Sequence, residues 1–285
     1  MARSLSRIPC ELTAAEKAEL VAAYDERGAE WIALGAVMMG FLNKFMDAIG
    51  VELEPVVVAE VTATMGADWS PGKAGAGLSP TEPRRPAPPV DGLRTKLRVV
   101  PLIPGAIRYD RRWQRGTPSR WPAVGIFLAE RTGHDFPVLS RLRSNRARRA
   151  MASMLRENLD PATTGVGMGV KVLAGAIFAE VVADRQLAED VRALARWAAV
   201  DPGRLDAAVA FAAGSSGAPP ADDRRATAVL TLARAASPSP AGIDAHTVSE
   251  CRDSGLPPAV IVEVVTWLAV LQMLHRLTGY THPAA

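Results

Sequence analysis

The stretch that decides the fold is LPPAVIVEVVTWLAVLQMLHRL, residues 256–277. Its paired prolines suit the first turn of a helix, where a missing backbone N–H does no harm. The apolar run that follows is short for a membrane span, and three polar side chains interrupt it: Glu263, Thr266 and Gln272. We therefore expect a helix over 258–278 and no segment that crosses a membrane.

The residues before this stretch also favour helices. Apolar residues make up 48% of the 285-residue chain and aromatic residues only 5%, so the core must be mostly Ala, Val and Leu, which suits close-packed helices. A charged fraction of 22% excludes wholesale disorder. No strand-like alternation lasts, and we expect an all-α fold. The further expected helices are 137–157, 166–198, 202–213, 221–236 and 241–254.

The N-terminal third divides into a helical part and a linker. Thr13 and Glu16 have the spacing of a capping box, and an apolar run follows them, so residues 1–65 are expected to form an N-terminal helical segment. Residues 66–122 are expected to form a linker that is first rich in Pro and Gly and then, over 93–122, basic and extended. The helical domain is expected over 123–285.

Positive charge is concentrated in one part of the chain. Residues 94–149 hold 14 Lys and Arg against three Asp and Glu, whereas the whole chain carries a net charge of +3. The remainder is therefore acidic, and such a division suggests a basic surface that faces an anionic ligand or an acidic surface. We do not expect nucleic acid as the partner.

Cysteine and histidine are scarce. Cys10 and Cys251 cannot build a disulfide framework, and four histidines leave little room for a zinc site, so we expect no metal and no cofactor. Cys10 lies in an N-terminal stretch that we expect to fray. The first residues lack the apolar stretch of a secretory signal, so the expected location is cytoplasmic.

Three landmarks in the C-terminal half carry a family resemblance: an Arg-Ala pair that opens a helix, a Gly-Leu turn, and a closing Asn-Arg-Leu, whose first residue is His in this chain. They stand here as Arg225-Ala226, Gly255-Leu256 and His275-Arg276-Leu277. The segment resembles AhpD-like proteins, the relatives of alkylhydroperoxidase and carboxymuconolactone decarboxylase, over 137–278. Phe41–Glu52 is similar to the same closing helix, and the likeness there spans 30–54. The resemblance implies an all-α fold and a homo-oligomer, for which we expect helices 31–49 and 258–278 to form the interface.

The peroxidase members of that family use a Cys-x-x-Cys pair and a nearby His, because only a thiolate attacks peroxide. The best local match is residues 176–185, which places Phe178 and Val181 at the cysteine positions and Arg185 at the histidine position. A second match, residues 239–246, retains the Asp-Ala-His ending at His246 and places Ser239 and Gly242 at the cysteine positions. The redox pair is absent under either alignment, so we expect a protein without thiol peroxidase activity.

The expected function is binding of a small hydrophobic or weakly acidic molecule in a helical pocket. Phe178, Val181 and Arg185 are the predicted binding residues, and Glu180 is the predicted acid or base beside them.

Three alternatives remain open. The chain could be an acid/base enzyme of the decarboxylase type that uses Glu180 or His246. It could be a one-cysteine peroxidase that uses Cys251. It could instead be a binding or scaffold protein that acts through the basic residues 94–149.

Overall fold

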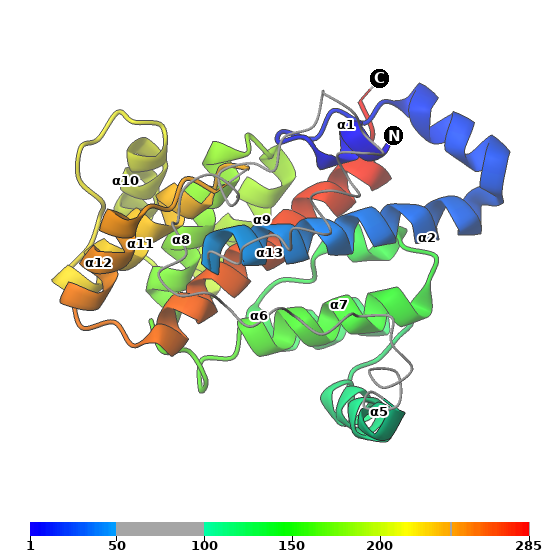
Figure 1. Cartoon of the computed structure of the whole chain (residues 1–285), viewed down its shortest axis with the longest axis horizontal. Helices are drawn as coiled ribbons and strands as arrows, with labels where there is room; N and C mark the ends of the chain where they lie inside the picture. The colour runs from blue at the N-terminus through cyan, green and yellow to red at the C-terminus, as the bar shows by residue number, and fades with distance from the viewer. Residues whose placement is uncertain (50–99, 240, 285) are drawn as a thin grey trace, which may run out of the picture. The chain divides into compact units, whose positions relative to one another are not determined.

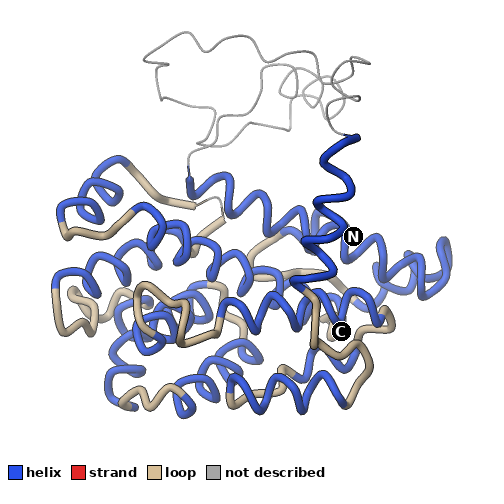
Figure 2. The backbone as a smooth tube through the Cα atoms, turned by 90° about the horizontal axis from the view of Figure 1, so that it is seen from below, coloured by secondary structure: helices blue, strands red, loops and turns tan. Residues whose placement is uncertain are grey.

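A computed structural model describes residues 1–49, 100–239 and 241–284. These residues form eleven α helices and two short 3-10 helices, and the only β pairing among them is an isolated bridge between Thr13 and Ala284. Figure 2 shows helices joined by loops. The all-α prediction is therefore confirmed. The predicted linker 66–92 and the end of the predicted N-terminal segment lie outside the described residues.

The chain divides into two compact units. One contains Met1–Val51 and Pro118–Ala285, and the other contains Glu52–Thr117. In the second unit the described elements are η3 (Val100–Leu102) and α5 (Ile103–Trp113). The expectation of an extended chain over 93–122 is thus wrong for α5. Pro104 lies in the first turn of α5, where proline starts a helix instead of breaking one.

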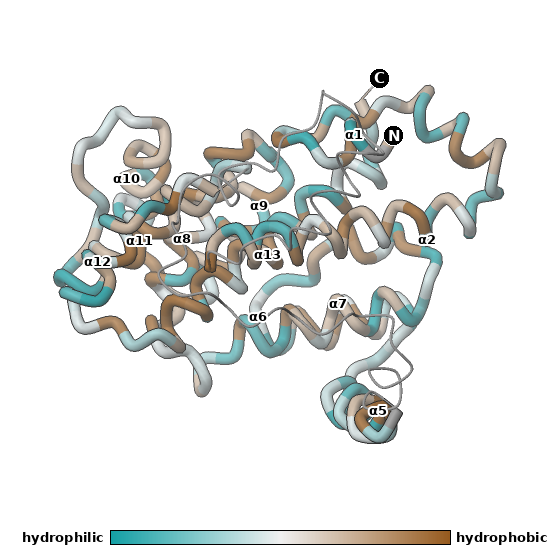
Figure 3. The backbone as a smooth tube through the Cα atoms, in the orientation of Figure 1, coloured by the Kyte–Doolittle hydropathy of each residue, from teal (hydrophilic) through white to brown (hydrophobic). Residues whose placement is uncertain are grey.

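The first unit is built around α13 (Pro258–Thr281), which packs against α2, α8 and α11 (Figure 1). Hydrophobic residues concentrate along α13 (Figure 3). Trp267 is fully buried, and its indole N–H donates to the carbonyl of Lys171 at 3.0 Å. The other elements are α1 (Ala2–Ser6), α2 (Ala14–Ile49), α6 (Ala123–Thr132), η4 (Pro137–Arg141), α7 (Asn145–Asn158), α8 (Met168–Val181), α9 (Arg185–Trp197), α10 (Pro202–Ala212), α11 (Arg224–Ala236) and α12 (Ala245–Asp253).

Two of the described helices, α2 and α13, are long and apolar enough to cross a membrane by length and composition alone. The most apolar window of α13 is 67% buried inside the protein, whereas that of α2 is 22% buried. The apolar surface of α13 is therefore largely used in the core. Much of the apolar surface of α2 remains exposed.

Helix α2 begins with the predicted capping box. The N–H of Thr13 donates to Glu16 Oε2 at 3.1 Å, and the N–H of Glu16 donates to Thr13 Oγ1 at 3.2 Å. The helix then kinks at Asp25, which has a φ of 59°. The Asp25 carboxylate accepts the N–H of Gly28 at 2.8 Å, which caps the helix that continues beyond the kink.

Two predicted helices are shorter in the structure. The helix expected over 166–198 breaks into α8 and α9, because Ala183 takes a positive φ and Asp184 caps the N-terminus of α9. The helix expected over 137–157 begins only at Asn145, where the Ser144 hydroxyl accepts the N–H of Ala147, and the residues before it form η4. Side-chain capping decided both starts.

Candidate functional site

In the part of the chain that the structure describes, the four residues predicted around the pocket do not surround one cavity. Phe178 is fully buried in α8, Val181 is half-buried, and Glu180 and Arg185 are exposed. Glu180 lines a hollow of about 30 Å³ beside α9 and α10, and none of the other three lines it. That space is about the share of a single water molecule. It is too small for the expected ligand.

His246 and Cys251, the residues of two separate alternatives, both lie on α12. The His246 side chain is 79% exposed, and its Nε2 lies 3.5 Å from Glu250 Oε1 on the helix surface. Cys251 is buried, and its Sγ lies 3.9 Å from the carbonyl of Ala228. Burial raises the pKa of the Cys251 thiol. The sulfur is therefore a protonated core atom and not an activated nucleophile.

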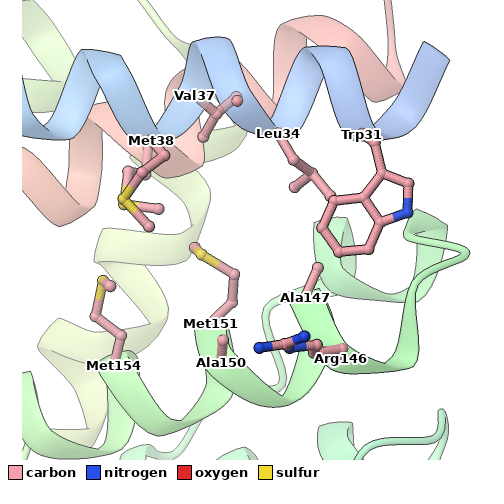
Figure 4. A pocket seen from close by; sticks show the side chains of 11 residues that line it. Trp31, Leu34, Val37, Met38, Arg146, Ala147, Ala150, Met151 and Met154 are labelled. Carbon is pink, nitrogen blue, oxygen red and sulfur yellow. The ribbon is translucent and has the colours of Figure 1, made fainter. Parts of the chain in front are cut away.

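A larger groove opens between α2 and α7. Its volume is about 480 Å³, and α13 contributes Met273 to it. Figure 4 shows the Trp31 ring toward the end that holds Arg146 and Ala147, with Met38 and Met154 toward the other end. The full lining is Trp31, Leu34, Gly35, Val37, Met38, Arg146, Ala147, Ala150, Met151, Met154 and Met273.

The lining is apolar apart from one cation. Four methionines supply flexible, polarisable side chains that adapt to ligands of irregular shape. Trp31 and Met38 are 45% and 43% exposed, so the groove is open to solvent. Arg146 is exposed, and no other described residue pairs with its guanidinium. The groove thus offers a hydrophobic surface with an unpaired positive charge at its edge.

A buried polar cluster joins three distant parts of the first unit. His275 Nδ1 lies 2.7 Å from Asp184 Oδ2, and the backbone N–H of Cys10 donates to His275 Nε2 at 3.1 Å. Because Nε2 accepts, the network assigns the imidazole proton to Nδ1, which donates to Asp184. The N-terminal stretch is therefore anchored on α13, and the expectation that Cys10 frays is wrong.

Arg276 extends this cluster toward α2. It is buried, and its guanidinium donates to the carbonyls of Ala36 at 3.3 Å and Ser6 at 3.1 Å. Gly40 makes room for it, since a Cβ there would lie 2.0 Å from Arg276 Nη1. Burial raises the pKa of the Cys10 thiol, although the Leu12 N–H and Arg276 oppose the shift. The cluster is suited to anchoring the N-terminus and not to thiolate chemistry.

Lys44 is a buried amine that sequence reasoning did not single out. Its Nζ donates to the carbonyls of Ala236 at 2.8 Å and Ser237 at 2.9 Å, and also to that of Pro238. These carbonyls belong to the last residue of α11 and the two residues after it, where a cation is favourable. Burial lowers the pKa of Lys44 to about 7. The amine is fully used as a helix cap, which leaves no donor for a ligand.

Comparison with models of protein families, with curated proteins and with solved structures found no match to this chain. The AhpD-like resemblance therefore stays a prediction. Among the described residues, no group of three or more His, Cys, Asp or Glu side chains is placed to hold a metal ion. The geometry of the groove is thus the main guide to function.

Proposed function

We propose that this chain binds a small, largely apolar molecule with an anionic group, and that the ligand lies in the groove between α2 and α7. The proposed ligand is of the class predicted from the sequence. Its proposed site is the groove between α2 and α7 and not the surroundings of Phe178. The observation that carries it is the apolar groove of about 480 Å³ with Arg146 at its edge. Pockets that hold small molecules commonly measure about 300–1,000 Å³ and combine apolar walls with few polar groups.

The lining favours binding over turnover. Among the described residues that line the groove, none carries a carboxylate, imidazole, thiol, hydroxyl or amine. General acid–base or nucleophilic catalysis needs such a group within hydrogen-bond reach of the substrate. Glu180 and His246, the residues of the decarboxylase alternative, lie exposed on α8 and α12. No observation favours that alternative.

Each part of the groove recognises a different part of the ligand. The methionines, Leu34 and Val37 remove hydrocarbon from water, which contributes about 0.8 kcal/mol for each buried methylene group. Arg146 attracts the anionic end through a solvent-exposed ion pair, which is worth about 0.2–1 kcal/mol. Most of the affinity is thus expected from the hydrocarbon part of the ligand. The anionic group determines which end of the ligand lies near Arg146.

Calorimetric titration with decanoate and decanol tests the proposal. We expect both to bind, and Met38→Glu to weaken both by about tenfold or more, because a carboxylate would stand in the apolar wall. Met39→Glu is the matched control, since Met39 is 53% exposed on the same helix and does not line the groove. Equal effects of the two variants, or no binding of either compound, would overturn the proposal.

The charged end is tested separately. Arg146→Gln is expected to weaken decanoate by up to about fivefold and to leave decanol unchanged, as an exposed ion pair predicts. Arg141→Gln is the control, because Arg141 is exposed on η4 and lies outside the groove lining. An equal loss for the acid and the alcohol would show that Arg146 contributes packing and not charge recognition.

A further inference from the structure

The described residues leave most of the surface of helix α5 exposed to solvent. None of its 11 residues is buried, and large apolar side chains are exposed along it and at its N-cap. Leu102 is 67% exposed, Ile103 and Ile107 are each 48% exposed, and Tyr109 is 71% exposed. Short helices in water depend on packing of an apolar face for most of their stability. The exposed apolar side chains of α5 therefore indicate that a membrane or another molecule covers this helix.

The apolar side chains of α5 and two of its arginines occupy different faces. Ile103 and Ile107 share one face by their spacing of four residues, and Arg108 and Arg112 share the opposite face by the same spacing. Arg111 follows Ile107 by four residues and lies at the boundary between the two faces. Asp110 follows Ile107 by one turn, and it accepts a hydrogen bond from Gln114 Nε2 at 2.8 Å. The apolar face is thus confined to the first two turns.

We infer that α5 lies on an anionic lipid surface, with Leu102, Ile103 and Ile107 among the acyl chains and the three arginines at the phosphates. A basic amphipathic helix with apolar and aromatic side chains is the usual form of such an anchor. Nucleic acid would pair with the arginines and leave the isoleucines in water. A second copy of α5 would bring two rows of arginines together, and like charges repel.

Sedimentation of the full chain with vesicles tests this inference. We expect the protein to pellet with vesicles that contain phosphatidylserine and to stay in solution with phosphatidylcholine alone. Each arginine near an anionic surface is expected to add about fivefold in partitioning. Replacing Arg108, Arg111 and Arg112 by Gln together should therefore abolish pelleting at physiological salt.

The apolar contribution is tested with a matched pair. Ile103→Glu is expected to lower partitioning by about tenfold or more, because a carboxylate would enter the acyl region. Ile126→Glu is the control, since Ile126 is 57% exposed on α6 and is not part of α5. If both variants bind vesicles as the parent protein does, or if neutral vesicles are bound equally, the inference is wrong.

Two other results would also overturn the inference. One is retention on duplex DNA that the arginine variant loses and Ile103→Glu keeps, without vesicle binding. The other is a dimer in sedimentation equilibrium that Ile103→Glu dissociates. Vesicle binding is independent of the proposed groove, so Met38→Glu should pellet normally. Its failure to pellet would place the lipid contact in the groove.

Discussion

Asp184 and His275 lie 91 positions apart in the chain, and their side chains meet at 2.7 Å in the buried interior of the first unit. The carboxylate of Asp184 also accepts the N–H of Leu187 at 3.0 Å and so caps α9. The far nitrogen of the imidazole accepts the N–H of Cys10. One pair thus joins the start of α9, the C-terminal third of α13 and the N-terminal stretch.

Removing the Asp184 carboxylate is expected to lower the free energy of unfolding by more than the loss of a helix cap alone would. Asp184→Ala removes the cap, worth about 1 kcal/mol, and leaves the buried His275 Nδ1–H unpaired, which adds about 1–3 kcal/mol. Asp201→Ala is the matched control, because Asp201 caps α10 at the exposed surface and has no histidine partner. Urea unfolding of the two variants gives the comparison, and equal losses would contradict a stabilising role for the pair.

The close approach of α2 and α13 at Gly40 makes a second prediction. A methyl group there would displace the buried Arg276 guanidinium from the carbonyls that it binds, so Gly40→Ala should lower the free energy of unfolding by about 1–3 kcal/mol. Gly35→Ala on the same helix meets nothing within 4 Å. It should be neutral or stabilising, because alanine favours a helix. Equal free energies of unfolding for Gly40→Ala and Gly35→Ala would contradict the close approach of Gly40 to Arg276.

Glu16 makes the stability of the N-terminal segment depend on pH. The Ser4 hydroxyl, the Thr13 N–H and the terminal ammonium hold the pKa of Glu16 at about 2, below its ordinary value of 4.5. A lowered carboxyl pKa contributes stability that is present above the unfolded pKa and is lost as the pH falls toward 2. Glu16→Gln should therefore lower Tm at pH 7 and match the parent protein near pH 2. A difference in Tm between the two proteins that stays constant from pH 7 to pH 2 would contradict a stabilising role for the ionised Glu16 carboxylate.

The two thiols are expected to react slowly and unequally. Burial raises the pKa of both, so their modification rates should continue to rise with pH above the ordinary thiol value of 9.0. Cys251 is 1% exposed, whereas Cys10 is only half-buried, so Cys10 should react first with an aromatic disulfide in the folded protein.

Cys251→Ser is expected to leave the fast phase of this reaction unchanged, and Cys10→Ser is expected to remove it. Peroxide turnover with a dithiol donor should be absent in the parent protein, since neither thiol is activated. Robust turnover that Cys251→Ser abolishes would revive the one-cysteine peroxidase alternative.

The sequence by itself determined the features that depend on neighbours along the chain. The all-α class follows from composition and apolar spacing, and the Thr13–Glu16 capping box and the proline start of α13 follow from residues within one turn. The break between α8 and α9 had one local signal, the Asp184 side chain that caps α9. The positive φ of Ala183 had none, since Ala183 is not glycine.

Only the tertiary structure decided which distant side chains meet. Hydrophobic periodicity shows which face of a helix is buried, and it does not show which helix covers that face or at what angle. Sequence reasoning therefore placed the ligand around Phe178, whose side chain fills the core, and missed the groove between Trp31 and Arg146. A cavity arises where two packed helices diverge, and that divergence depends on side chains far apart in sequence.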